Sequence, residues 1–453
     1  MFPFIPQQRS RSSHAKVVRP RKLAPCLAAA VAVTLAASAQ GAVETWVGNT
    51  SVNWNATNWI GDNPIPLDFD SLVFGPLGTA GATLNNDLTA DMVLSGITFS
   101  VDAGAYTFGG NSITLAGPVL NSSTSLQTIN LPVSLLGQQT FTTTAGGGDI
   151  TLGGVISGSD GITKAGAGTL TLSNPANTYT GETIFAGGII NVATLSDYGV
   201  PSSLGARDTI HENGSLTGIG LHFLGGTLQY TGATPQSTNR QIRMLIGNGA
   251  TIDASGSVPE ATLSFTHSGA NINLFDTGGT RNLTLTGTNT GKNSFSIRLT
   301  NQAAAQTSLT KTGPGTWVIP NSDNTYTGET IIAGGILNVA SVSDYGVPSS
   351  IGARLFSEEN NSLTGVSLHF LGGTLQYTGS TPQSTNRHIR ILNGNGATIT
   401  DAAGNPADLS GAVTNPAGVL TVDTTAPTIP GVTTNPGSGT VAAGTPIVIT
   451  VGT

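Results

Sequence analysis

The sequence predicts an all-β chain folded as a stacked β-solenoid. Residues 162–252 and 309–399 carry nearly the same text at a constant offset of 147 residues, which separates Lys164 from Lys311. Within both copies, short stretches that alternate apolar and polar residues are separated by turns rich in Gly and Asn. Long repeats of strand and turn text are typical of solenoids, in which each coil covers its neighbour.

The composition agrees with this class of fold. Charged residues are 9% of the 453 residues, against about 25% in ordinary soluble domains. Gly and Pro together stay below the share of about 25–30% that indicates disorder. No amphipathic helical pattern is present after residue 40. Because binding to phosphate groups needs a basic patch, the scarcity of positive charge argues against a nucleic-acid partner.

Residues 1–39 have the pattern of a secretory signal peptide. An apolar run from Leu27 to Ala37 precedes the small-residue cleavage site Ala37-Ser38-Ala39. The run is shorter than the roughly 18 residues that span a membrane, so we expect no stable membrane span after removal. Cys26, the only cysteine, lies in this segment, so the mature chain is predicted to have no disulfide. Removal of the segment changes the formal net charge from −7 to −13, because six basic residues leave with it: Arg9, Arg11, Lys16, Arg19, Arg21 and Lys22.

Residues 40–80 are predicted to form an N-terminal cap, because three of the four tryptophans fall here: Trp46, Trp54 and Trp59. The first coil of a solenoid exposes apolar side chains and unpaired strand edges, which an aromatic cap would cover. The alternative is a platform on which sugar rings stack. Asp68 and Asp70 could contact a cation, but two carboxylates do not define a calcium site.

Residues 81–400 are predicted to form the solenoid itself. Alternation places Leu170 with Leu172 and Leu228 with Tyr230 on inward faces. Leu221 and Phe223 are expected to be buried, which turns His222 to the solvent. Val133, Leu135 and Phe141 can serve as further inward layers. The stretch Asn177–Gly181 lies between two strands, where Asn and Gly tolerate left-handed backbone.

The segments LTLSNPANTYTGETIFAGGIINV (170–192) and TWVIPNSDNTYTGETIIAGGILNV (316–339) resemble the autotransporter-associated β-strand repeat of large secreted bacterial proteins. The text at 283–295 and 308–317 resembles the sequence that recurs between such repeats. The similarity covers residues 43–400. It implies a right-handed parallel β-helix passenger, exported to the cell surface, associated with the bacterial outer membrane and usually not enzymatic.

Residues 401–453 leave the repeat. Thr400–Asn405 and Thr421–Pro427 resemble the linkers of bacterial immunoglobulin-like repeats in adhesins, and 439–453 resembles the first strands of such a module. An immunoglobulin-like module needs about 100 residues. Further adhesin modules or a membrane barrel are therefore expected beyond Thr453.

Parallel β-helices also host polysaccharide lyases and glycosidases, so the ionisable residues of the repeats are candidates for catalysis. The ionisable candidates recur in both copies: Glu182, Asp197, Arg207, His222, Arg240 and Arg243 match Glu329, Asp344, Arg354, His369, Arg387 and Arg390. An enzyme seldom needs two complete sites on one rod, so duplication favours a structural or multivalent role. Asp253, Glu260 and Asp276 occur once and could form a single site. No motif of a known catalytic class is present, so no catalytic, cofactor-binding or metal-binding residue and no cofactor is predicted.

The function predicted from the sequence is a non-enzymatic, structural or adhesive stalk that binds polymeric surfaces, glycan or extracellular matrix, through repeated weak contacts. One alternative is a β-helical carbohydrate-active enzyme, which requires clustered carboxylates. The other is a carbohydrate-binding protein that uses Trp46, Trp54 and Trp59, which requires exposed, coplanar rings.

Export can be tested directly on secreted material. We expect cleavage before Gln40, or after Ala42 as a close alternative, because small residues occupy the positions that signal peptidases read. N-terminal sequencing of the secreted chain measures this. A sequence that begins at Met1 would contradict the prediction.

Overall fold

A computed structural model describes most of the chain from residue 41 to residue 401, with short gaps, and four short strands beyond it. The described ranges are 41–144, 146–208, 219–245, 249–267, 279–302, 305–358, 366–391 and 397–401, with single residues or short pieces between some of them. The predicted signal segment 1–39 lies outside the described residues. No helix in the described part of the chain has the length and apolar character needed to cross a membrane.

Three long sheets contain nearly all of the strands, and we name them sheets A, B and C. Sheet A contains β1 (Val43–Trp46), β2 (Trp59–Ile60), β3 (Asp70–Phe74), β5 (Met92–Phe99), β7 (Ile113–Leu115), β8 (Val119–Asn121), β10 (Val133–Leu135), β11 (Gln139–Thr143), β13 (Ile156–Ser157), β14 (Ile162–Gly166), β16 (Thr183–Phe185), β18 (Leu221–Phe223) and β21 (Ile242–Met244).

From β4 onward sheet B has one strand in each coil, and its 13 strands correspond to about 13 coils in the described part of the chain. Its strands are β4 (Thr83–Asn86), β6 (Thr107–Gly110), β9 (Gln127–Ile129), β12 (Ile150–Leu152), β15 (Thr169–Leu172), β17 (Ile189–Val192), β19 (Thr227–Tyr230), β22 (Ala250–Ala254), β24 (Arg281–Thr286), β26 (Thr307–Lys311), β28 (Thr330–Ile332), β30 (Leu368–Phe370) and β33 (Ile389–Ile391).

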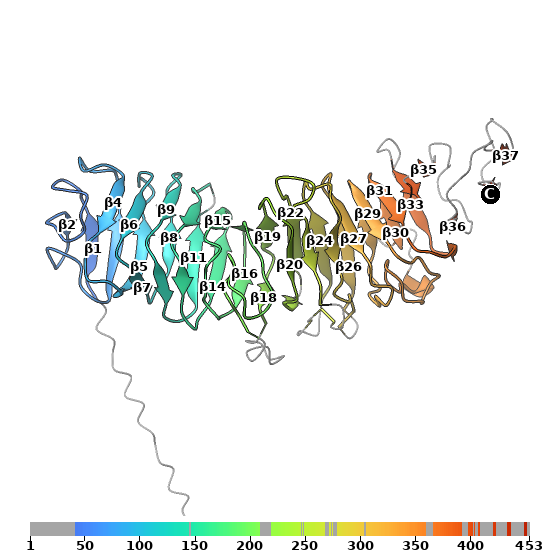
Figure 1. Cartoon of the computed structure of the whole chain (residues 1–453), viewed down its shortest axis with the longest axis horizontal. Coiled ribbons are helices and arrows are strands. Elements are labelled where there is room, and N and C mark those ends of the chain that lie inside the picture. Colours follow the sequence, from blue (N-terminus) through green and yellow to red (C-terminus); the bar gives the residue numbers. More distant parts are fainter. Residues whose placement is uncertain are drawn as a thin grey trace, which may run out of the picture. The chain divides into compact units, whose positions relative to one another are not determined.

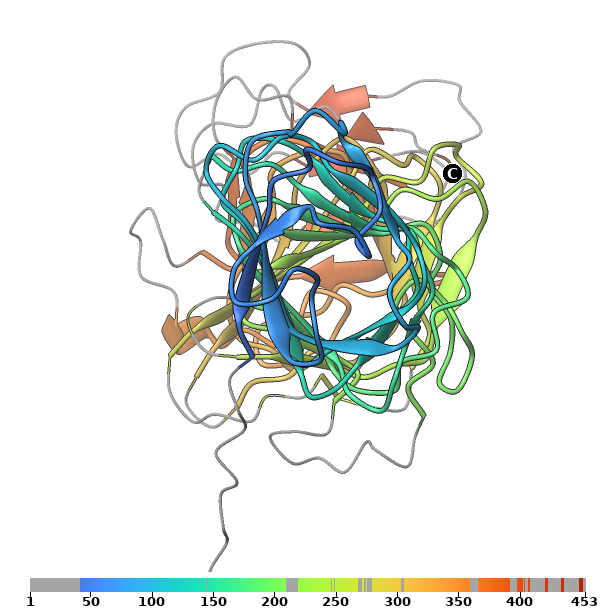
Figure 2. The same ribbon diagram turned by 90° about the vertical axis from the view of Figure 1, so that its left-hand side faces the viewer.

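Sheet C begins only in the second half of the solenoid. It contains β20 (Gln236–Thr238), β23 (Leu263–Phe265), β25 (Asn293–Phe295), β27 (Thr316–Ile319), β29 (Ile336–Val339), β31 (Thr374–Tyr377), β34 (Thr398–Thr400) and β35 (Pro406–Ala407). Neighbouring strands within each sheet run parallel, except in the pairs β1–β2 and β34–β35. The coils follow one another along the solenoid (Figure 1), and an end-on view shows them winding around one interior (Figure 2).

The interior follows from the alternation of side chains along each strand. Leu170 and Leu172 are fully buried while Thr169 and Thr171 are partly exposed, as a period of two requires. The other side chains predicted to point inward are also buried: Val133, Leu135, Phe141, Leu221, Phe223, Leu228 and Tyr230. Phe185 and Phe223 stack in successive coils with ring centroids 4.3 Å apart. The all-β solenoid is therefore confirmed.

The second repeat does not occupy the same sides of the solenoid as the first. The chain passes from sheet A to B to C and back to A, as β18, β19, β20 and β21 show. In the first copy, β14 and β15 lie in sheets A and B, whereas their counterparts β26 and β27 lie in sheets B and C. Counterpart side chains such as Leu368 and Tyr377 are buried, but each lies one side further around the axis. The repeat unit of 147 residues thus winds through several complete coils and then along one further side, so the second copy begins one sheet later than the first.

The N-terminal coils are filled by aromatic rings. Trp46, Trp54 and Trp59 are buried, and Trp54 packs edge-on to Phe108 with centroids 5.2 Å apart. The indole planes of Trp54 and Trp59 are 89° apart, and those of Trp46 and Trp59 are 73° apart. These rings present no common exposed face, so the interpretation as a sugar-stacking platform is wrong. Asp68 and Asp70 accept hydrogen bonds from the backbone amides of Val93 and Leu67.

Most of the predicted immunoglobulin-like segment, 401–453, lies outside the described residues. Besides β35, the described strands here are β36 (Leu420–Val422), which pairs with β32 (Gln383–Thr385), and β37 (Thr433–Asn435), which pairs with β38 (Val448–Thr450). Both pairs are antiparallel. The only helical element described is a short 3₁₀ turn, η2 (Phe356–Glu358).

Truncation of an inward side chain should destabilise the solenoid strongly. Leu228→Ala removes a fully buried side chain, which should lower the free energy of unfolding by about 2–5 kcal/mol. Thr171→Ala, on an outward face of the same sheet, serves as the control and should change it by less than about 0.5 kcal/mol. Guanidinium denaturation measures both. Equal effects from the two variants would contradict the inward assignment.

Candidate functional site

Each repeat contains one coil that is much longer than its neighbours, because a loop follows its second strand. The loops begin after β17 in the first copy and after β29 in the second, and both read SDYGVPSS near their start. We call residues 193–208 and 340–355 the first and second duplicated loops. The strand shift places the first loop after sheet B and the second after sheet C, so the loops leave different sides of the solenoid.

A buried arginine holds each duplicated loop. Arg240 donates hydrogen bonds to the backbone oxygens of Leu204 at 2.6 Å and Gly205 at 2.8 Å, and a longer one to Val200. In the second copy, Arg387 binds the oxygens of the corresponding residues Ile351, Gly352 and Val347 at 2.8, 2.7 and 3.1 Å. Hydrogen bonds to a charged donor stabilise by about 1.5–3 kcal/mol each, so these arginines fix the shape of the loops.

The remaining duplicated polar residues also bind backbone groups. Arg207 donates to the oxygen of Thr180, and Arg354 donates to the oxygen of Thr327. Asp197 accepts from the amide of Asn239, and Asp344 accepts from the amide of Asn386. The candidates Arg207, Asp197 and Arg240 therefore have structural partners in the loop, and the same holds for Arg354, Asp344 and Arg387.

The motif around Asn177 joins the loop to the coil beneath it, and its role differs from the one predicted. Asn177 has no positive φ; it is buried, accepts from the amide of Ile156 and donates to the oxygen of Ser203. Asn324 makes the equivalent bonds to Leu299 and Ser350. Gly181 is needed for a different reason, because a Cβ there would overlap the backbone of Asp160.

The tips of the loops face solvent. Val200 is 48% exposed and Val347 is 47% exposed, in spite of the fixed loop backbone. Gly199 and Gly346 precede them with φ of 73° and 72°, a left-handed backbone that glycine adopts without strain. A Cβ at Gly199 would meet no other atom within 4 Å, and one at Gly346 would meet only the Leu355 side chain at 3.6 Å, so there is open space beside both glycines. Each repeat therefore presents one exposed valine on a loop whose backbone a buried arginine binds.

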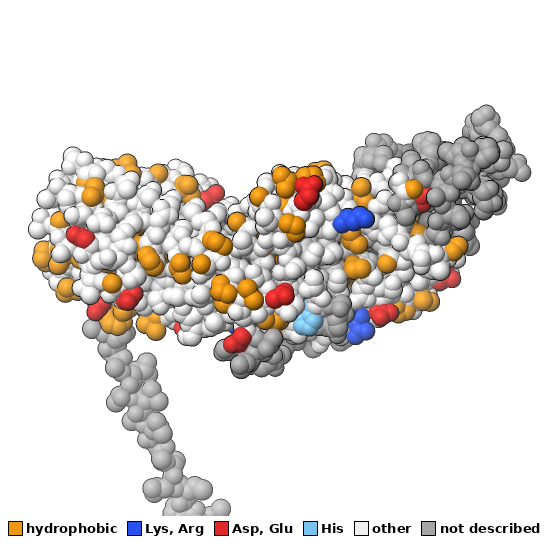
Figure 3. Space-filling view, in the orientation of Figure 1, with side chains coloured by type: hydrophobic (Ala, Val, Ile, Leu, Met, Phe, Trp, Pro, Cys, Tyr) orange, Lys and Arg blue, Asp and Glu red, His pale blue; other side chains and the backbone are white. Residues whose placement is uncertain are grey.

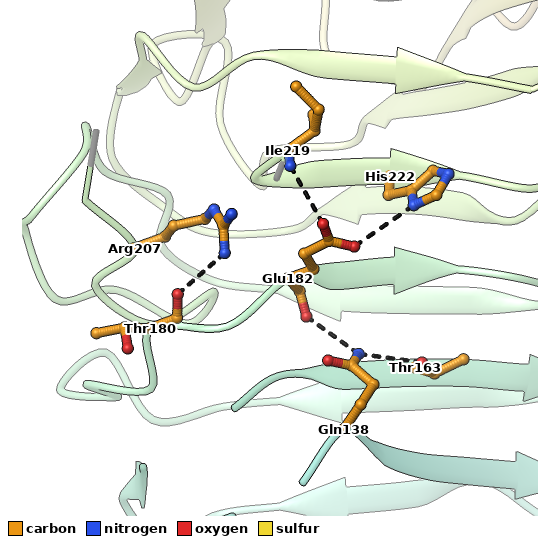
Figure 4. Close-up of polar contacts among 7 residues, drawn as sticks. All are labelled: Gln138, Thr163, Thr180, Glu182, Arg207, Ile219 and His222. Atoms are coloured by element: carbon orange, nitrogen blue, oxygen red, sulfur yellow. Dashed lines mark hydrogen bonds and ion pairs between the residues drawn. The ribbon is translucent and has the colours of Figure 1, made fainter. Parts of the chain in front are cut away.

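Glu182 and His222 lie together on the outer face of sheet A (Figure 4). Glu182 accepts a hydrogen bond from the amide of Ile219, and its other oxygen lies 3.6 Å from His222 Nδ1. Gln138 of a preceding coil donates to the backbone oxygen of Glu182 and to the hydroxyl of Thr163. The prediction that His222 faces solvent is wrong, because its side chain is only 9% exposed.

Arg243 lies beside His222 in the ladder between β18 and β21 and is fully buried. In the second copy, His369 pairs with Arg390 in the same register. Burial lowers the pKa of His369; Glu329 opposes this shift and Arg390 adds to it. A Glu–His–Arg group is thus repeated on both outer faces, and its residues lie between neighbouring coils rather than in an open cleft.

Two lysines that are not among the residues predicted from the sequence are buried in the structure. Lys164 lies in the inward ladder between Phe141 and Phe185, and its Nζ donates to the backbone oxygens of Ala165 at 2.5 Å and Gly166 at 3.3 Å. Its side chain is fully buried. The alternation of side chains along the strand could have predicted this burial, because Lys164 lies two residues after the inward-facing Ile162 and therefore points to the same side.

Lys311 repeats this arrangement in the second copy. It donates to the oxygens of Thr312 at 2.6 Å, Gly313 at 2.9 Å and Gly334 at 3.0 Å. Burial lowers the pKa of Lys164 and of Lys311 to about 8, and Asp149 partly opposes this for Lys164. A Cβ at Gly335 would lie 2.7 Å from the Lys311 nitrogen, so the following coil needs glycine where it covers the ammonium group.

The carboxylates that occur once do not form a recognisable pair in the described residues. Asp253 accepts from Gln229 and from Ser255, and Glu260 is exposed in the following turn. Asp276 lies outside the described residues. No group of three or more His, Cys, Asp or Glu side chains that could hold a metal ion occurs in the part of the chain that the structure describes.

The buried lysines should make stability depend on pH in the alkaline range. A lysine whose folded pKa is about 8 destabilises the fold while it is charged, and this penalty disappears as pH rises from 8 to the unfolded value of 10.5. Compared with the double variant Lys164→Met/Lys311→Met, the unmodified chain should therefore gain stability across this window. Denaturation at pH 7.5 and 10 measures the difference. A gap between the two proteins that is the same at both pH values would contradict the prediction.

Comparisons with known proteins agree with this architecture. Residues 162–192 and 309–339 match the passenger-associated-transport-repeat, so both copies begin with this repeat. The chain is 34% identical over 313 residues to the adhesin BmaC autotransporter of Brucella suis biovar 1 (strain 1330). This match covers 65% of the chain, and the chain spans 9% of the length of that relative. No solved structure matches the chain. The chain thus carries two autotransporter passenger repeats on a parallel β-solenoid, and the repeats and the relative indicate a secreted protein of the cell surface, associated with the bacterial outer membrane.

Proposed function

We propose that the chain is a non-enzymatic adhesive stalk that holds polymeric partners, glycan or extracellular matrix, at its two duplicated loops. The observation that carries the proposal is the pair of exposed tips, Val200 and Val347, each on a loop that a buried arginine holds in one shape. The similarity to an adhesin autotransporter supports the same role. Ordering such loops before binding removes much of the entropic penalty of association.

The shift between the repeats determines how the two loops can be used. Because the loops leave different sides of the solenoid, a straight polymer lying along one side contacts only one of them. Two contacts therefore engage two polymer molecules, or one flexible polymer that winds around the coils. The stalk then bridges neighbouring polymers in addition to binding each of them.

The structural roles of the ionisable candidates support a non-enzymatic function. Glycoside hydrolysis needs two carboxyl groups about 5–9.5 Å apart that flank a bound sugar. Asp197 binds a backbone amide, Glu182 binds an amide and faces His222, and Asp253 binds two side chains. Each of these carboxylates is thus engaged in holding the fold.

Charged substitutions at the tips test the bridging role. Val200→Asp and Val347→Asp each add a charge to one tip and leave the arginine contacts in place. Each single variant should still bind beads coated with collagen or chitin, whichever the unmodified chain binds, but should no longer aggregate them. The double variant should lose binding by about tenfold or more. Sedimentation measures binding, and turbidity measures aggregation.

Val258→Asp is the matched control, since Val258 is an exposed valine outside both loops. It should leave binding and aggregation unchanged. Full aggregation by both single variants would reject the role of the loops. Release of soluble fragments from the polymer, abolished by Asp253→Asn, would favour the enzyme instead.

A further inference from the structure

The charges of this chain are unevenly distributed along it. Residues 41–163 contain nine acidic residues and no Lys, Arg or His. The eleven Lys and Arg residues that follow are mostly interior, and eight are buried: Lys164, Arg207, Arg240, Arg243, Arg281, Lys311, Arg354 and Arg387. The N-terminal coils are therefore uniformly anionic, and the described part of the chain carries few cations at its surface to offset them.

The same coils expose a group of large apolar side chains. Val43 is 57% exposed, Ile60 64%, Leu67 50% and Phe69 44%. Val43 and Ile60 project from the outer side of the β1–β2 pair, where Ile60 lies opposite Thr45. Leu67 and Phe69 immediately precede β3, the parallel neighbour of β1. We call these four residues the first-coil surface; in Figure 3 apolar and acidic side chains lie side by side at this end.

A buried carboxylate lies directly beneath this surface. Glu44 is fully buried, and its Oε1 accepts a hydrogen bond from the amide of Asn63. Its Oε2 has no hydrogen-bond donor among the described residues and lies under Gly61, where a Cβ would overlap it. An unsatisfied buried carboxylate is unfavourable, and a nearby cation would relieve this. Only a glycine separates Glu44 from the surface between Ile60 and Asp62.

Phe69 is held outward at an energetic penalty. Its φ is 69°, and it and Asp91 are the only non-glycine residues with positive φ in the described part of the chain. Its amide donates to the oxygen of Val93 at 2.6 Å, and the Ser95 hydroxyl donates to its oxygen at 2.5 Å. A left-handed backbone at an aromatic residue is unfavourable by about 1–2 kcal/mol. Glycine would adopt this conformation without penalty, so the backbone of the turn does not itself require an aromatic residue at this position.

We propose that the first-coil surface docks a cationic, amphipathic polypeptide segment of a partner protein. Its apolar side chains contact Val43, Ile60, Leu67 and Phe69, and its Lys or Arg side chains lie near Asp62, Asp68 and the buried Glu44 carboxylate. Charge complementarity selects this occupant, because an anionic or neutral segment gains no electrostatic attraction from coils that carry acidic residues and no basic ones. The proposal goes beyond the role of the duplicated loops and concerns a separate part of the chain.

Binding of short peptides to the mature chain tests the proposal. The probe is a twelve-residue peptide that alternates lysine and leucine, compared with a glutamate–leucine peptide and a lysine–serine peptide of the same length. The lysine–leucine peptide should bind at least about tenfold more tightly than either comparison peptide, and its affinity should fall with added salt. Fluorescence anisotropy measures all three. Equal binding of the glutamate–leucine peptide, or of the lysine–serine peptide, would overturn the proposal.

Two substitutions locate the surface. Ile60→Thr removes apolar area from a strand position, and Phe69→Gly removes the ring while relieving the left-handed backbone. The double variant should lose at least about tenfold in affinity, and Phe69→Gly alone should keep or raise the melting temperature. Leu136→Thr, at an exposed leucine of a later coil, should change nothing.

Unchanged affinity in the double variant would overturn the assignment of the surface, and so would a lower melting temperature for Phe69→Gly, since it would give the ring a structural role. The peptide should bind equally to the double variant Val200→Asp/Val347→Asp. Peptide affinity and polymer binding are therefore lost through different residues, which separates this proposal from the function proposed above.

Discussion

The backbone ladder from coil to coil is the constraint on which the rest of the structure depends. Every coil must leave its N–H and C=O groups in position for the next one, and this fixes which side chains point inward. A coil has little freedom except at its corners, where the chain changes sheet. The polar residues of the repeats are concentrated there: Lys164, Asn177 and Arg240 each bind backbone groups at a corner or loop.

This constraint explains why the sequence predicted the fold well. Parity along a strand identified Leu170, Leu172, Leu228 and Tyr230 as core residues without any knowledge of the coils around them. The same rule predicts that Lys164 points inward, but lysine side chains generally prefer solvent, and this preference argues against the correct assignment. The long aliphatic stem packs in the interior while the ammonium group reaches the backbone oxygens of the corner, so parity outweighs residue type.

The candidate site was much harder to predict. Parity places His222 outward, which is correct, but an outward side chain can still be buried between neighbouring elements. In the sequence, Glu182 and Glu329 are equivalent positions of the two copies. The offset of 147 residues does not show whether the two copies lie on the same sides of the solenoid, because it does not give the number of residues in each coil. The shift from sheets A and B to sheets B and C depends on the lengths of the intervening coils. The lengths of the coils show the side from which each loop leaves the solenoid only after every strand has been assigned to a sheet.

The extra side within the repeat unit affects what happens when the number of repeat units changes. If one more unit of the same length were added by tandem duplication, its loop would leave the third side, and a fourth would return to the first. Successive loops would then be arranged helically around the solenoid axis, and every third repeat unit would present its loop on the same side. Gain or loss of one unit would alter the direction of every later loop as well as the length of the stalk, so copy number would itself set the pattern of contacts that the surface presents.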